Sequence, residues 1–263
     1  IVQRMASMAG MFYIMAFFCY AAARTAPSHR KRMFYFVLTV LLYLFSVGSK
    51  ENTALFPVMV LLYEFMFFQR ISFGFFRRGG KYIAIGVVLL GLVVFFINNG
   101  LTFFEFEGRQ NILRKMALYE DKPFTMWERV ITEWRVLLHY FILFFVPLGY
   151  SAERGLYLRL NIDYDFPVSH SIFDPPTTFL SLLVIAGVLC FAVIRVRSFP
   201  VFSFFIFWYF VNLAIESTII PLALVFEHRM YLPSVALSVM FVIAVFALTG
   251  RISLQKRVME GQG

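Results

Sequence analysis

Runs of apolar residues long enough to cross a lipid bilayer are the feature that most constrains this chain. A membrane-spanning helix needs about 20 consecutive, mainly apolar residues. The segments that meet or approach this length are residues 5–23, 33–49, 53–68, 82–98, 177–194, 200–222 and 232–250. We therefore expect an all-α integral membrane protein with about seven transmembrane helices, folded as a single transmembrane domain over residues 1–263.

Composition agrees with a membrane location. Hydrophobic residues make up 60% of the chain and charged residues 15%, whereas about 25% of residues are charged in soluble domains. The net charge of +9 comes from short clusters of Lys and Arg between the apolar runs, which indicates loops at a membrane surface rather than a nucleic-acid interface. Cys19 and Cys190 both lie inside apolar runs, so neither a disulfide framework nor a metal site is expected from them.

The basic clusters also predict the orientation, because Lys and Arg are enriched in short cytoplasmic loops. The clusters are Arg24 with Arg30, Lys31 and Arg32; Arg70 with Arg77, Arg78 and Lys81; Arg195 with Arg197; and Arg251 with Lys256 and Arg257. If all four face the cytoplasm, the C-terminus is cytoplasmic. The long polar loops 99–133 and 150–176 then lie on the outer side.

An eighth apolar stretch, residues 134–149, conflicts with this orientation if it crosses the membrane. The stretch is short, and it is interrupted by Pro147 and Gly149. We interpret it as a re-entrant or interfacial helix with both ends on the outer side, preceded by an amphipathic segment at 127–134. The alternative is an ordinary transmembrane helix that follows an irregular loop.

Polar residues at the outer ends of the predicted helices require an explanation, because charges in or near a bilayer are costly. Lys50, Glu51 and Asn52 form a tight connection between two helices, and Arg4 lies at the start of the first helix. Lys50 places a positive charge at the level of the lipid headgroups. The alternative is an ordinary polar turn between two helices.

Two further polar groups belong to the same side. Glu216 lies near the outer end of its helix and is expected to pair with Lys50, Arg4 or Arg229. The segment Glu227, His228, Arg229, Met230 and Tyr231 leads directly into the last helix. Phosphate oxygens bind readily at helix N-termini and to arginine, so Arg229 is the strongest candidate for an anion contact. The alternative is a set of interfacial Arg and Tyr side chains.

The loop 150–176 contains Asp163, Asp165, His170 and Asp174. Asp163 and Asp165 have the spacing of a metal-binding pair, but surface loops often carry such pairs by chance, so no metal site is assigned. The prolines of the loop favour an extended lid or wall over a cavity. In the apolar stretch, His139 is interpreted as an interior histidine rather than a catalytic base.

Four segments resemble a group of bacterial multi-spanning proteins that carry tetratricopeptide repeats. They are VQRMASMA at residues 2–9, SKENTALFP at 49–57, LNIDYDFP at 160–167 and FEHRMYLPS at 226–234. The group is similar to the protein O-mannosyltransferases and belongs with the C-type glycosyltransferases. The last of these segments is the most specific.

The resemblance implies a C-type glycosyltransferase core in the bacterial inner membrane. Such enzymes transfer a sugar from a polyprenyl-phosphate carrier to a protein or glycan acceptor at the outer face. Arg4, Lys50 and Arg229 would then hold the carrier phosphate, supported by Glu51, Asn52, Glu216, Glu227, His228 and Tyr231. The lipid-linked sugar is the expected donor, and no cofactor is assigned, although a divalent metal is an open alternative.

The chain also departs from the family. The family's catalytic carboxylate lies in an outer loop upstream of the matching region, and its repeats follow that region. The resemblance therefore implies an interior piece of a larger protein, with the missing parts of the enzyme as possible partners and catalytic residues unknown. Two other functions remain open: a component of a lipid-linked glycan transporter or polymerase, and a non-catalytic membrane scaffold subunit.

Overall fold

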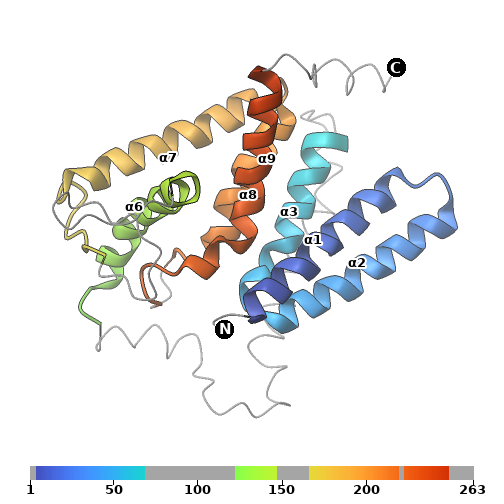
Figure 1. Ribbon diagram of the computed structural model, residues 1–263, viewed down its shortest axis with the longest axis horizontal. Helices are drawn as coiled ribbons and strands as arrows, with labels where there is room; N and C mark the ends of the chain where they lie inside the picture. Colours follow the sequence, from blue (N-terminus) through green and yellow to red (C-terminus); the bar gives the residue numbers. More distant parts are fainter. Residues whose placement is uncertain (1–3, 69–121, 147–165, 219–221, 249–263) are drawn as a thin grey trace, which may run out of the picture.

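The computed structural model describes residues 4–68, 122–146, 166–218 and 222–248, and every regular element in these ranges is helical (Figure 1). The elements are α1 (Arg4–Thr25), α2 (His29–Ser49), η1 (Glu51–Leu55), α3 (Phe56–Tyr63), η2 (Glu64–Phe68), α6 (Met126–Phe145), α7 (Pro176–Arg195), α8 (Pro200–Ala214), η5 (Glu227–Met230) and α9 (Tyr231–Leu248). Elements η1 and η5 are 3-10 turns, and η2 is a π-helical turn.

Five helical stretches are long and apolar enough to cross a membrane. They are α1, α2, the continuous stretch Glu51–Phe68, α7, and Glu227–Ala247 at α9. The expected all-helical architecture is thus confirmed for the described residues, with five stretches that suit a membrane by length and composition, but the expected count of seven is not reached there. The predicted helix 82–98 lies outside the described residues.

Helices α1 and α2 form an antiparallel hairpin along small side chains. Ala6, Ala9, Ala16 and Ala23 lie on the buried side of α1, and small residues allow two helices in a membrane to approach closely. The Ser46 hydroxyl of α2 donates a hydrogen bond to the Ala9 carbonyl at 2.8 Å. The opposite side of α2 exposes apolar side chains such as Phe34 and Leu44, as expected of a surface that contacts lipid.

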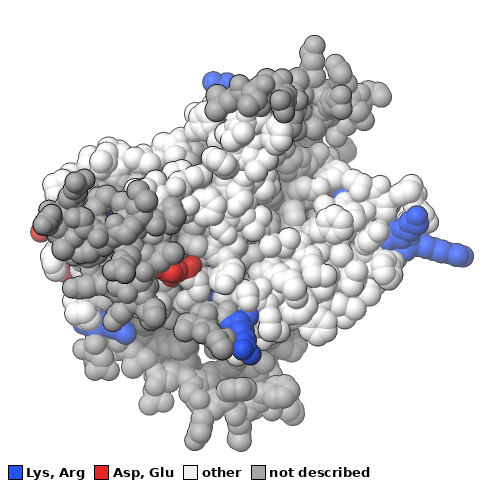
Figure 2. Space-filling model, in the orientation of Figure 1, with Lys and Arg blue, Asp and Glu red and all other residues white. Residues whose placement is uncertain are grey.

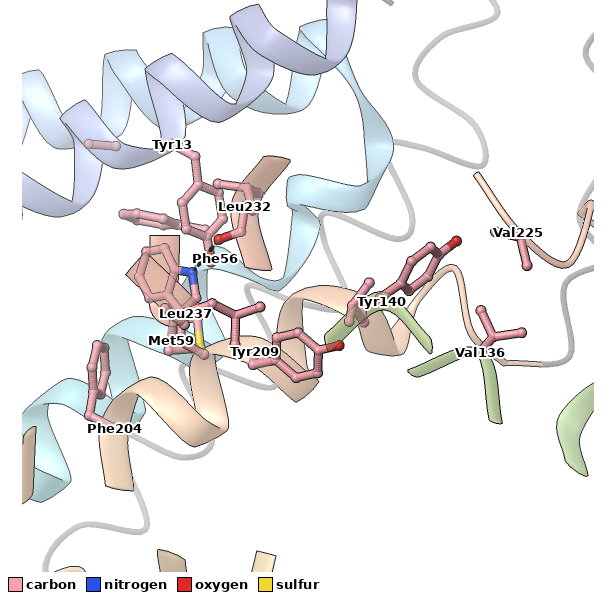
Figure 3. Close-up of a cluster of buried hydrophobic side chains, with 14 of the residues drawn as sticks. Tyr13, Phe56, Met59, Val136, Tyr140, Phe204, Tyr209, Val225, Leu232 and Leu237 are labelled. Atoms are coloured by element: carbon pink, nitrogen blue, oxygen red, sulfur yellow. Dashed lines mark hydrogen bonds between the residues drawn. The ribbon is translucent and has the colours of Figure 1, made fainter. Parts of the chain in front are cut away.

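An aromatic core joins this hairpin to α3, α8 and α9 (Figure 3). Tyr13 of α1 contacts Phe56 of α3 and Trp208 of α8 in edge-to-face geometry, with ring centroids 5.1 and 5.4 Å apart. The Trp208 indole also donates a hydrogen bond to the Leu232 carbonyl of α9 at 2.8 Å. The high aromatic content of the sequence therefore supplies much of the packing between helices.

Helix α8 is shorter than predicted. The sequence suggested a transmembrane helix over 200–222, but α8 ends at Ala214 after 15 residues, which is about 22 Å at 1.5 Å per residue and less than the hydrocarbon thickness. The chain then turns, and carbonyl groups of Glu216, Thr218 and Leu222 accept hydrogen bonds from Arg129 of α6. Those carbonyls are consequently bound by a side chain of another helix.

Helix α6 differs from the prediction at its beginning. The amphipathic segment 127–134 and the apolar stretch 134–149 were treated as separate, but residues Met126–Phe145 form one continuous helix. Thr125 and Glu128 form a capping box at its start, and this defines the helix boundary. Helix α6 is not among the helices apolar enough to span a membrane, and its re-entrant path remains a prediction.

Helix ends gather on two opposite faces. The end of α2, the end of α8 and the start of α9 lie together, as the contacts among Lys50, Glu216 and Arg229 show. We call this the polar face. At the other ends of α1 and α3, Arg24 pairs with Glu64, and Phe67 packs on Phe204 near the start of α8. We call this the basic face.

Most of the surface between these faces is uncharged. In the view of Figure 2, most of the visible surface of the described residues is uncharged, the largest group of Lys and Arg lies at the turn between α1 and α2, and smaller groups lie elsewhere. The basic residues of that turn are Arg24, Arg30, Lys31 and Arg32. This distribution suits a protein with lipid around its middle and water at both faces.

Candidate functional site

The polar face contains a network of five charged residues that come from three distant parts of the chain. Lys50 Nζ lies 2.6 Å from Glu216 Oε1, and Arg229 Nε lies 3.5 Å from Glu216 Oε2. Glu133 Oε1 lies 2.9 Å from Arg129 Nη2 and 3.8 Å from Arg229 Nη1. Each of the two carboxylates is therefore shared by two cations, and we call these five residues the ion network.

Exposure increases from one end of the ion network to the other. The side chains of Arg129 and Glu133 are 0% exposed and that of Arg229 is 1% exposed, while Glu216 is 8% and Lys50 is 13% exposed. Three cations and two carboxylates also leave a formal charge of +1 on these five residues. The network therefore favours an anion, and Lys50 is its most accessible cation.

Arg129 anchors the chain segment that carries Glu216. Its guanidinium donates hydrogen bonds to the carbonyls of Glu216, Thr218 and Leu222 at 2.7, 3.1 and 2.7 Å. Hydrogen bonds from a charged donor are among the strongest in proteins. Since α6 supplies Arg129, this helix fixes the path of the backbone after α8 and with it the position of Glu216.

Arg229 lies in η5, immediately before α9, as its sequence position predicted. Its guanidinium donates hydrogen bonds to the carbonyls of Leu224 and Ala223 at 3.0 and 2.7 Å and lies 5.5 Å from the centre of the Phe226 ring. Its donors face protein groups, so Arg229 serves as an internal partner of Glu216 and Glu133 rather than as a cation at the rim.

The structure describes the surroundings of each predicted cation. Lys50 and Arg229 both contact Glu216, which confirms that this carboxylate is paired with cations. Arg4 is exposed at the start of α1, and the described residues supply no ion pair to its side chain. A clamp made of Arg4, Lys50 and Arg229 acting together stays a prediction, because cations do not pair with one another and would meet only through a bound anion.

The predicted supporting residues surround the network at different depths. Glu51 and Tyr231 are exposed, Asn52 is buried, and Glu227 and His228 are half-buried. The His228 ring packs on the Phe226 ring with centroids 5.0 Å apart. These residues form the edge of the site, and Glu216 is the member of the supporting set that belongs to the ion network itself.

Sequence reasoning missed Arg129 and Glu133. Both lie within the amphipathic segment 127–134, and their spacing of four residues places them on one face of a helix. That face continues through Val136 and Tyr140, which are 0% exposed, and Figure 3 shows Val136 and Tyr140 beside Val225. A charged pair in line with buried apolar residues was the available signal that both charges are buried.

Residues 166–175 lie along the outside of α6, and we call them the strap. The Ser169 amide donates to the Thr132 hydroxyl at 2.8 Å, and Arg135 donates to the Pro167 carbonyl at 2.8 Å. His170 Nδ1 lies 2.6 Å from Glu128 Oε1. These contacts place the described end of the predicted outer loop against α6, whereas Asp163 and Asp165 lie outside the described residues.

Glu128, at the exposed start of α6, holds its charge firmly. The backbone amide of Thr125, the His170 contact and the Thr125 hydroxyl lower the pKa of Glu128 from its ordinary 4.5 to about 2. The carboxylate therefore stays ionised over most of the acidic range and remains available to both the helix cap and the strap.

A smaller polar cluster lies on the basic face. Glu64, the first residue of η2, pairs with Arg24 of α1 and accepts a hydrogen bond from the Tyr20 hydroxyl at 2.6 Å. Arg24 also lies 4.6 Å from the centre of the Phe68 ring. This cluster ties the end of α1 to the end of α3.

Comparisons with known proteins identify no relative: no protein-family model, no curated protein and no solved structure matches the chain.

Proposed function

We propose that this chain is the membrane core of a glycosyltransferase that uses a polyprenyl-phosphate-linked sugar. The polar face is the outer face in this proposal, and the sugar passes from the carrier to a protein or glycan acceptor there. The resemblance of residues 2–9, 49–57, 160–167 and 226–234 to the C-type glycosyltransferases motivates the proposal.

The observation that carries the proposal is the ion network at the ends of the helices. A lipid phosphate lies at the level where helices leave the bilayer, and the ion network presents a net positive charge there. Lys50 is its most accessible end, with a side chain that is 13% exposed, and an ammonium group has three donors, of which Glu216 engages one. We assign Lys50 as the residue that contacts the carrier phosphate and stabilises the charge that develops on it as leaving group.

The remaining members hold Lys50 and its surroundings in place. Arg129 fixes the backbone at Glu216, Glu133 joins Arg129 to Arg229, and Arg229 holds Glu216 from inside. No residue of the described part is assigned as the carboxylate that acts on the acceptor.

Lys50→Gln tests this function in two assays. In the full-length protein we expect sugar transfer from the lipid carrier to fall at least about a hundredfold, the loss typical of removing one transition-state contact, with normal membrane insertion. In the purified chain reconstituted in lipid nanodiscs, binding of a polyprenyl monophosphate should weaken at least about tenfold. Lys31→Gln, a matched change at the basic face, should alter neither. Unchanged transfer and binding in Lys50→Gln would exclude the proposal.

A second candidate function, a non-catalytic membrane scaffold, is favoured by the burial of Arg129, Glu133 and Arg229. A purely structural network would make Lys50→Gln less stable without any dependence on a phosphate ligand. Thermal unfolding with and without polyprenyl monophosphate separates the two functions, because a ligand that binds the folded protein raises its unfolding temperature.

A further inference from the structure

Glu216 lies between the most exposed and one of the most buried cations of the ion network. One carboxylate oxygen contacts Lys50 Nζ at 2.6 Å, and the other lies 3.5 Å from Arg229 Nε. The first distance is that of a short charge-assisted hydrogen bond, whereas the second exceeds the usual range of 2.7–3.2 Å for nitrogen donors. The carboxylate is thus held tightly by Lys50 and loosely by Arg229.

A small movement of the Glu216 carboxylate would make Arg229, rather than Lys50, its closer partner. A shift of about 0.5 Å toward Arg229 would bring the second oxygen into normal hydrogen-bond distance. The movement is directed inward, because the side chain of Arg229 is 1% exposed and that of Lys50 is 13% exposed. The Glu216 backbone need not move, since Arg129 holds its carbonyl at 2.7 Å.

We propose that Glu216 is an exchangeable internal counterion, which leaves Lys50 for Arg229 when a phosphate headgroup binds Lys50. This inference rests on the proposed function and concerns the regulation of the same site. Glu216 acts as a positioning residue: without ligand it neutralises Lys50, and with ligand it neutralises Arg229. The burial of Arg229 then has a specific role, which is to receive Glu216.

Charge explains why the exchange controls affinity. A phosphate bound at Lys50 approaches a carboxylate in a partly buried environment, where like charges repel more strongly than in water. The ligand must therefore displace Glu216 before it can bind well. Weakly charged ligands cannot displace it, so the counterion also makes the site selective for a strong anion.

The test measures binding of farnesyl phosphate, a short polyprenyl monophosphate, to the whole chain in nanodiscs. Glu216→Gln keeps the size of the side chain and removes its charge, and we expect the affinity to rise about tenfold. Damage to the fold would lower the affinity, so the direction of the change is diagnostic. In the double variant Lys50→Gln with Glu216→Gln, the gain should disappear, because it operates through Lys50.

Asp174→Asn is the matched control, since it likewise removes one carboxylate charge, but from an exposed side chain outside the site; the affinity of this variant should change less than about twofold. Inorganic phosphate and farnesol, tested beside farnesyl phosphate, separate recognition of the headgroup alone from recognition of the lipid. If Glu216→Gln is unstable, Glu216→Asp retains the charge on a shorter side chain, and the affinity should rise about threefold.

The outcomes separate the inference from the proposed function. If farnesyl phosphate binds and requires Lys50, but neither Glu216 variant binds it more tightly, the counterion exchange is wrong and the phosphate site remains. If wild-type protein shows no binding that depends on Lys50, both fail. A gain in Glu216→Gln that persists without Lys50 also overturns the exchange.

Discussion

Glu133 has the most demanding environment of any residue in the ion network. Its side chain is completely buried and contacts the guanidinium groups of Arg129 and Arg229, which come from α6 and η5. A buried ion pair contributes little net stability compared with an apolar replacement, but removal of one partner leaves a buried charge without compensation. Here one carboxylate compensates two cations, so its loss affects both.

We therefore expect Glu133→Gln to destabilise the protein by about 3 kcal/mol or more. Burial raises the pKa of Glu133 from its ordinary 4.5 to about 7, against the opposing effect of Arg129 and Arg229. The change preserves the size of the side chain, so above about pH 8, where the carboxyl is ionised, the effect reports the lost charge. Unfolding by sodium dodecyl sulfate in mixed micelles measures the free energy. The exposed Glu51, changed to Gln in the same way, should cost less than about 0.5 kcal/mol, and equal effects in both variants would show that the buried charge is not essential.

For single residues, the sequence predicted which charged side chains belong to the site better than it predicted their partners. Glu216 was expected to find a cation, and it pairs with Lys50 and Arg229. Arg4 was expected to join Lys50 and Arg229 at a bound phosphate, and that part of the site stays a prediction. The partners of Arg129 could not be inferred from its own position, because they are backbone carbonyls about 90 residues away.

Among the helices, α6 combines two tasks on two sides. One side carries Arg129 and Glu133 into the ion network, and the other carries Glu128, Thr132 and Arg135, which hold the strap. Positions 128, 132 and 135 are spaced by four and three residues and so form one continuous row. The strap and the ion network are therefore both attached to one helix.

The strap should loosen in acid. Because the folded state lowers the pKa of Glu128 to about 2 from its ordinary 4.5, its contribution is fully present above about pH 4.5 and is lost as the pH falls toward 2. We expect the hydrogen-exchange protection of the Ser169 amide, corrected for intrinsic exchange, to decrease over this range. Glu128→Gln should remove the pH dependence, since Gln can still form the capping box. A decrease of the same size in that variant would contradict the role of Glu128.

Helix positions followed from the apolar runs wherever a helix packs mainly on lipid and neighbouring helices. The expected 5–23, 33–49 and 177–194 correspond to α1, α2 and α7 with small changes at the ends. Helix α8 was predicted too long because hydropathy continues past Ala214, whereas the carbonyls beyond that residue bind Arg129. Tertiary hydrogen bonds of this kind leave no trace in a hydropathy pattern.

At the scale of the whole molecule, the two faces differ in how their charges are used. The polar face holds five charges in the largely buried ion network, while Arg30, Lys31 and Arg32 at the basic face are exposed. Exposed basic residues at the ends of spans indicate the cytoplasmic side. Buried charges carry no such signal, so the orientation rests on the basic face.

A single-cysteine experiment tests the orientation. With Cys19 and Cys190 replaced by Ala, Glu51→Cys at the polar face should react with a membrane-impermeant maleimide in intact cells. Arg30→Cys at the basic face should react only after permeabilisation. Both positions are exposed, so accessibility within the protein does not bias the comparison. The reverse pattern would place the polar face in the cytoplasm and would exclude an outer-face carrier site.

Arg129 recognises the main chain between α8 and α9, because all three of its acceptors there are carbonyl oxygens. Every residue type has that oxygen, so the hydrogen bonds of Arg129 do not depend on which side chains this connection carries. Side chains of this connection can therefore be substituted, which changes the surface near Lys50, while the backbone keeps the same path. The buried guanidinium of Arg129 thus allows the sequence of the nearby surface to vary.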